Sequence, residues 1–100
     1  MRRGTTPTHE FELPFETNAI KKIIITYAQR DEIVLEKKTE DCKMDGTIVS
    51  VTLTQEETLR LDSSKHVKIQ AKILLFNGKA LVSNKITKAV SDVLNEEVMI

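Results

Sequence analysis

The sequence predicts an all-β fold: an antiparallel β-sandwich of about seven strands, with one short helical turn between the two sheets. Three observations lead to this expectation. Hydrophobic and polar residues alternate along most of the chain, as they do in half-buried strands. The dipeptides Asp45-Gly46 and Asn77-Gly78, which favour hairpin turns, each separate two alternating segments. No segment predicts a long helix. One hundred residues form a single domain.

The first alternating segment covers residues 9–16, with aromatic and aliphatic side chains on one side and glutamates on the other. Pro14 cannot donate to a ladder, so this strand lies at an edge or ends there. Residues 20–28 and 33–38 predict a hairpin, in which Ile33 and Leu35 are expected opposite Tyr27 and Ile25.

The next hairpin is predicted around Asp45-Gly46. A two-residue loop there places Cys42 opposite Val49 and Met44 opposite Thr47. After this hairpin, Thr54 is followed three residues later by Glu57, which is a capping box. A helical turn from Gln55 is therefore expected to carry the chain from one sheet to the other.

The last hairpin joins residues 66–76 to residues 79–90 through Asn77-Gly78. A two-residue loop places Ile73 opposite Val82 and Ile69 opposite Ile86. The core is then expected to include Ile25, Leu35, Val51, Ile69, Ile73 and Val82. An immunoglobulin-like arrangement is the favoured topology, although the Cys…Trp…Cys pattern of antibody domains is absent. A small open barrel is the alternative.

Composition and motifs exclude several classes of function. Fifteen Lys and Arg balance fifteen Asp and Glu without segregation, so neither nucleic acid nor membrane is an expected partner. No apolar run follows the two N-terminal arginines, as a secretory signal requires. His9, His66 and the single Cys42 lie apart, so no metal or other cofactor is expected. No glycine-rich phosphate loop or marked nucleophile occurs, and the sequence predicts a protein that is not an enzyme.

Candidate partner contacts lie at both ends of the sequence. On the outer face of the last hairpin, Lys68, Lys72 and Lys85 form a basic patch that suits an acidic partner or protects the sheet from aggregation. Leu74 and Leu81 are expected to pair on that face beside Phe76, as a contact site or beneath the C-terminal segment. Arg2 and Arg3 complete the set. We expect residues 1–7 to be a flexible arm ordered by a neighbouring subunit, and residues 8–100 to be a single sandwich domain.

Two segments carry a family resemblance: "RRGTTPT" at residues 2–8, followed by alternation, and "LTQEETL" at residues 53–59. With the hairpins, they make the chain resemble small prophage-encoded structural proteins of Gram-positive bacteria, which are similar to the sandwich-type N-terminal domain of phage baseplate upper proteins. The resemblance implies a structural role in a tail or baseplate, with other tail or baseplate proteins or further copies of the chain as partners. It also implies residence in the host cytoplasm during assembly and then in the virion. A stand-alone immunoglobulin-like module that binds a protein or carbohydrate is the alternative.

Overall fold

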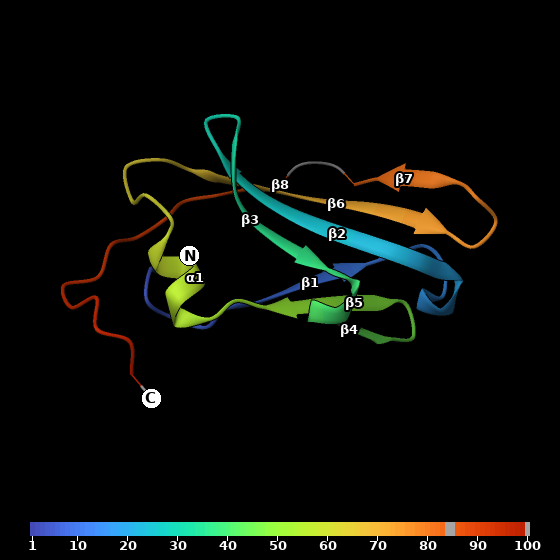
Figure 1. Ribbon diagram of the computed structural model, residues 1–100, viewed down its shortest axis with the longest axis horizontal. Helices are drawn as coiled ribbons and strands as arrows, with labels where there is room; N and C mark the ends of the chain where they lie inside the picture. The colour runs from blue at the N-terminus through green and yellow to red at the C-terminus, as the bar shows by residue number, and fades with distance from the viewer. Residues whose placement is uncertain (84–85, 100) are drawn as a thin grey trace.

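The chain folds into two antiparallel sheets, as the computed structural model shows for residues 1–83 and 86–99 (Figure 1). The smaller sheet has the order β1-β5-β4, with β1 at Thr8–Glu12, β5 at Ile48–Thr52 and β4 at Cys42–Asp45. The larger sheet has the order β3-β2-β6-β7, formed by Glu32–Lys38, Ile20–Gln29, Val67–Leu75 and Ala80–Val82. Strand β8, Ile86–Lys88, also pairs with β6. Three short helical segments join the strands: η1 (Thr17–Ala19), η2 (Thr39–Asp41) and α1 (Gln55–Leu59).

The strand order is immunoglobulin-like. The smaller sheet corresponds to strands B, E and D, and the larger one to C′, C, F and G, with β7 and β8 sharing the place of G along β6. The helical turn α1 lies between E and F. Before β1, the described residues form one parallel bridge, between Arg2 and Ser91, in place of a regular first strand. The predicted sandwich, with its helical turn between the sheets, is confirmed.

The core lies between the two sheets, and most of the residues expected there are buried. The core residues, whose side chains are nearly inaccessible to solvent, are Phe11, Ile20, Ile23, Ile25, Tyr27, Leu35, Val49, Val51, Leu53, Leu61, Val67, Ile69, Ala71, Ile73 and Val90. The prediction for Val82 is wrong, because its side chain is 57% exposed. Near the hairpin tip, Ile73 pairs with Leu81 and not with Val82.

A three-residue loop causes this shift in register. The Leu75 N–H donates to the Lys79 carbonyl, which leaves Phe76, Asn77 and Gly78 as the loop. Gly78 has a φ of +89°, as expected for the left-handed residue that ends a three-residue hairpin loop. The register has returned to the predicted one at β8, where Ile69 pairs with Ile86.

The other two hairpins also differ in register from the predictions. Asp45 pairs with Ile48, so the loop is Gly46-Thr47, and Cys42 lies opposite Val51. This shift of two residues leaves the inward face unchanged. In the β2–β3 hairpin a bulge between Tyr27 and Ala28 places Leu35, and not Ile33, opposite Tyr27. The remaining pairings follow the same shifts: Met44 lies opposite Val49, Ile33 opposite Ala28 and Ile25 opposite Lys37.

The capping box predicted for α1 is confirmed by two reciprocal hydrogen bonds. The Glu57 N–H donates to Thr54 Oγ1 at 3.1 Å, and the Thr54 N–H donates to Glu57 Oε1 at 2.9 Å. These bonds satisfy two donors that a helix start otherwise leaves unpaired. The helix therefore begins where the sequence predicts.

The N-terminal segment, residues 1–7, bonds to the chain's own C-terminal segment, and this differs from the expected partner-dependent arm. The Arg3 N–H donates to the Ser91 carbonyl at 2.9 Å, and the Ser91 N–H donates to the Met1 carbonyl at 2.7 Å. The Arg3 guanidinium bonds to Asp92, to Glu96 and to a carbonyl of α1. Figure 1 shows both termini on the side of the molecule that carries α1. Arg3 thus finds its carboxylates within its own chain.

Deleting residues 1–7 is expected to destabilise the isolated domain. Several hydrogen bonds worth about 0.5–1.5 kcal/mol each are lost, offset by the entropy that the segment regains, for a net loss of about 1–3 kcal/mol. Calorimetry should show a melting temperature lower by roughly 4–8 °C for each kcal/mol lost. Arg2→Ala is the control, because this exposed side chain contributes little beyond a hydrogen bond to the Asp92 carbonyl. An unchanged melting temperature after the deletion would favour the partner-dependent arm.

Candidate interaction surface

An apolar patch lies on the outer face of the larger sheet. Alternation along β2 and β6 sends one set of side chains into the core and the other outward. Cross-strand pairing arranges four outward apolar side chains and two lysines in two rows across β2, β6 and β7. One row contains Lys22, Leu74 and Ala80, and the other contains Ile24, Lys72 and Val82. We call these four apolar residues the outer patch.

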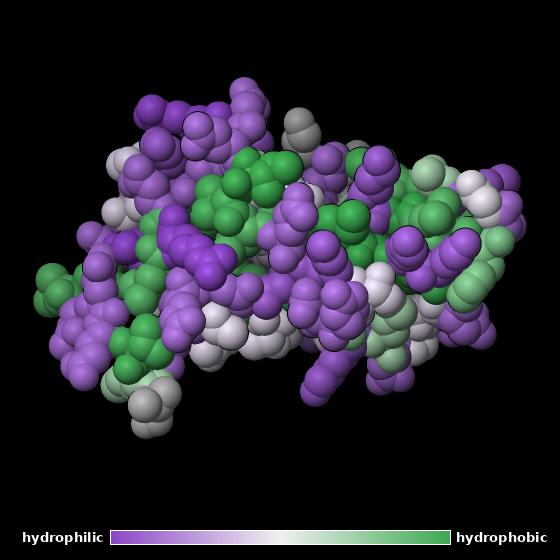
Figure 2. All heavy atoms as spheres, in the orientation of Figure 1, coloured by the Kyte–Doolittle hydropathy of each residue, from purple (hydrophilic) through white to green (hydrophobic). Residues whose placement is uncertain are grey.

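The outer patch is accessible and hollowed. Ile24 is 39% exposed and Val82 57% exposed. Ile24, but not Val82, lines a pocket of about 220 Å³, together with Lys22, Lys72, Ile73, Leu74 and Ala80. Figure 2 shows hydrophobic atoms at the right of the molecule, over the ends of β2, β6 and β7, among hydrophilic ones. A surface of this kind suits contact with another protein.

The charge around the outer patch is positive. Lys22, Lys68 and Lys72 extend along the same face, and within the described residues none of the three forms an ion pair. Glu36 also faces outward, but it pairs with Thr26 farther along the sheet. An acidic partner surface would therefore meet unneutralised lysines here.

The structure brings some of the predicted contact residues together and separates others. Lys68, Lys72 and Leu74 share the outer face of β6, as expected. Phe76 lies at the hairpin tip, 69% exposed, where its N–H donates to the Ala19 carbonyl. Leu81 does not pair with Leu74: it lies opposite Ile73, and Ala80 lies opposite Leu74.

Three other predicted contacts lie elsewhere. Arg2 and Arg3 lie at the opposite end of the molecule, beside the C-terminal segment. Lys85 lies outside the described residues. Sequence reasoning missed Ile24 and Val82. Alternation along β2 already placed Ile24 on the outer face and could have identified it. The outward position of Val82 could be predicted only from the length of the β6–β7 loop.

Two polar pairs cross between elements inside the sandwich. Tyr27 is completely buried, and its hydroxyl lies 2.7 Å from Nδ1 of His9 on the facing sheet. Lys37 of β3 reaches Glu57 of α1 with a 2.6 Å ion pair. Burial, followed by the charges of Cys42 and Glu57, raises the pKa of Tyr27. These pairs satisfy buried polar groups and link the layers of the fold.

Cys42 is a half-buried thiol that packs against the core. Burial raises its pKa, and the neighbouring Asp41 carboxylate adds to that effect. A raised pKa favours the thiol over the nucleophilic thiolate. Cys42 therefore acts as a packing residue beside the core.

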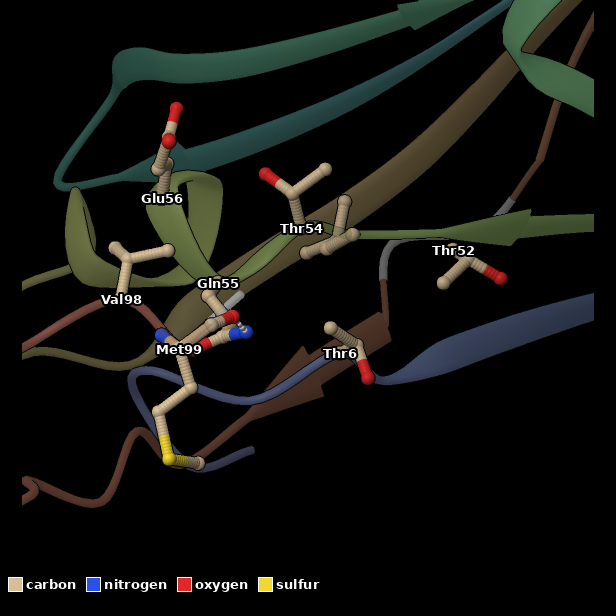
Figure 3. Close-up of a pocket in the computed structure, with 8 residues that line it drawn as sticks. Thr6, Thr52, Thr54, Gln55, Glu56, Val98 and Met99 are labelled. Atoms are coloured by element: carbon tan, nitrogen blue, oxygen red, sulfur yellow. Dashed lines mark hydrogen bonds between the residues drawn. The ribbon is translucent and has the colours of Figure 1, made fainter.

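A second hollow, of about 330 Å³, lies where α1 meets the C-terminal segment (Figure 3). Threonines 6, 52 and 54 line it, together with Gln55, Glu56, Val98 and Met99. The Gln55 side chain donates to the Met99 carbonyl at 2.7 Å and accepts from the Met99 N–H at 2.8 Å. The chain's own C-terminal segment therefore forms part of the wall of this hollow.

Within the part of the chain that the structure describes, no three His, Cys, Asp or Glu side chains gather as a metal site would require. The one described α-helix has five residues, which is too short to cross a membrane.

Comparison with known proteins gives a likeness in structure alone. No family model matches the sequence, and no curated protein does either. One solved structure that is similar is the V domain of amphioxus IgVJ-C2, at 11% sequence identity and a TM-score of 0.38. The similarity covers 90% of this chain and 96% of that one. At this level it carries no information about activity, and the immunoglobulin-like assignment comes from the strand order itself.

Proposed function

We propose that this chain is a non-enzymatic structural component of a phage or prophage tail or baseplate, acting by protein–protein assembly. The outer patch is the observation that carries the assembly role. It combines exposed Ile24 and Val82 with a pocket and with two lysines, Lys72 between these two side chains and Lys22 beside Leu74. Exposed apolar patches with polar neighbours are typical of protein interaction sites.

The composition of the patch suggests how binding energy would be divided. Its apolar side chains would supply most of the affinity, at roughly 25 cal/mol for each Å² removed from water. Lys22 and Lys72 would contribute selectivity and rate of encounter, because charges across an interface steer more than they bind. The partner surface should therefore combine apolar side chains with carboxylates placed to meet these two lysines.

The tail or baseplate context is supported by the resemblance of residues 2–8 and 53–59 to small prophage structural proteins. Such assemblies repeat their subunits, and a small sandwich with an exposed sheet face suits repeated contacts. The partners would be other tail or baseplate proteins or further copies of this chain. The protein would act in the host cytoplasm during assembly and afterwards in the virion.

A stand-alone binding module for a protein or carbohydrate is the second candidate, and Phe76 favours it. This aromatic side chain is 69% exposed at a hairpin tip, and loops at the ends of an immunoglobulin-like sandwich often carry binding residues. Phe76→Ala would abolish binding to purified cell-wall polysaccharide in that case. The same variant would assemble normally if the outer patch is the functional surface.

Particle incorporation tests the proposed function. Tagged chain produced during prophage induction should co-purify with tails, and Ile24→Glu should lower its amount in particles at least tenfold. Ile33→Glu is the matched control, because Ile33 is 61% exposed at the far end of the same sheet. Absence of the unmodified chain from purified tails would overturn the tail assignment. Equal incorporation of the two variants would exclude the outer patch.

A further inference from the structure

The C-terminal segment, residues 92–99, is firmly attached and yet presents apolar side chains to solvent. Arg3 holds Asp92 and Glu96, and Gln55 holds the backbone of Met99. Between Asp92 and Glu96, Leu94 is fully exposed, at 108% of its reference area, and the side chain of Met99 is 77% exposed. A backbone attached in this way loses less entropy on binding than a free chain end would.

The charge of this segment is complementary to that of the outer patch. Glu97 is exposed and forms no ion pair among the described residues. Lys22 and Lys72, beside the apolar side chains of the outer patch, likewise form no ion pair in the described part of the chain. The pocket of about 220 Å³ is smaller than a typical ligand site and suits a single apolar side chain.

The two surfaces lie at opposite ends of the molecule. Figure 1 shows the C-terminal segment at the left and the β6–β7 hairpin at the right of the long axis, along which the chain extends 46 Å. Figure 2 shows hydrophobic atoms projecting at the far left, over the C-terminal segment. One copy therefore cannot place its own C-terminal segment on its own outer patch.

We propose that copies of this chain associate head to tail, with Leu94 of one copy entering the pocket of the outer patch on the next and Glu97 approaching Lys22 and Lys72. This inference rests on the proposed function and identifies the partner as a second copy. Because the two contacting surfaces differ, the association is heterologous and produces a ring or an open filament.

The charges favour this contact over a symmetric dimer of two outer patches. A two-fold pairing of the patches would bring the lysine-bearing faces of two copies together, without a carboxylate from the patch to neutralise them. The acidic C-terminal segment meets the same lysines with the opposite charge. Self-association should accordingly weaken as ionic strength rises.

Sedimentation velocity of the full chain across a concentration series tests the proposal. We expect species larger than a dimer, and Leu94→Asp and Val82→Glu should each weaken association at least tenfold. In a mixture of the two variants, the intact C-terminal segment of the Val82→Glu chain can still bind the intact outer patch of the Leu94→Asp chain. The mixture should therefore form dimers and no larger species. Neither variant should change the melting temperature, because both side chains are exposed.

A charge exchange provides the specific readout. Glu97→Lys and Lys72→Glu should each weaken association, and a mixture or a combined variant carrying both should recover it. Ile33→Glu should have no effect. Association that survives Leu94→Asp but is lost in Val82→Glu would indicate a symmetric patch dimer and overturn the head-to-tail model. A chain that stays monomeric at millimolar concentration would also overturn it, whereas incorporation into tail particles would still support the proposed function.

Discussion

Ile73→Ala should lower the free energy of unfolding by about 2–5 kcal/mol, which is the usual cost of truncating a buried isoleucine. Ile73 is 3% exposed on the inward face of β6, and the cost combines lost burial with the cavity left between the sheets. Because the chain has no tryptophan, chemical denaturation followed by circular dichroism, and not by tryptophan fluorescence, measures this loss of stability.

Val82→Ala is the matched comparison for Ile73→Ala. The predicted two-residue loop places these two side chains opposite each other in the core, whereas the three-residue loop leaves Val82 57% exposed. Its truncation should change the free energy of unfolding by less than about 0.5 kcal/mol. Similar costs for the two variants would show that the hairpin has the register predicted from sequence.

Lys37→Met should cost about 3 kcal/mol in the free energy of unfolding, at the lower end of the range for breaking a buried ion pair. The side chains of Lys37 and Glu57 are 10% and 17% exposed, and the variant leaves the Glu57 carboxylate without its cation. Lys37→Met combined with Glu57→Gln should be less destabilised than the sum of the two single changes, because no unpaired charge remains. Strict additivity in this double-mutant cycle would contradict the structural role of the pair.

The same pair predicts a dependence of stability on pH. Burial alone would raise the pKa of Glu57, but hydrogen bonds from Lys37 and from the Thr54 N–H bring it below its ordinary 4.5. A carboxyl whose pKa is lowered by folding stabilises the protein above its unfolded pKa, and this stabilisation is lost as pH falls through the folded pKa. The difference in stability between the unmodified chain and Glu57→Gln should therefore be constant near neutral pH and shrink below about pH 4.5.

Local patterns in the sequence determined the elements and the inward faces. Alternation identified the strands, because a half-buried strand exposes every second side chain. The spacing of Thr54 and Glu57 located the start of α1, because a capping box depends on residues three positions apart. Even the wrong register at the β4–β5 loop left Val49 and Val51 inward, because a shift of two residues preserves the face.

Hairpin registers were decided by details that dipeptides do not specify. Asn77-Gly78 suits a two-residue loop as well as the last two positions of a three-residue one, and the choice moves Val82 out of the core. The bulge after Tyr27 similarly moves Ile33 away from the position opposite it. A difference of one residue in a loop or bulge changes cross-strand neighbours without changing the local pattern.

Contacts between distant residues were decided by the tertiary structure alone. Arg3 lies 89 residues from Asp92 in sequence, and the return of the C-terminal segment past α1 brings them together. Lys37 shares the inward face with Leu35 by simple alternation, but its burial depends on Glu57 arriving from α1. The outer patch likewise exists because the fold aligns Ile24 of β2 with residues of β6 and β7. Alternation specifies which face a side chain occupies, and only the packing of the sheets specifies its neighbours.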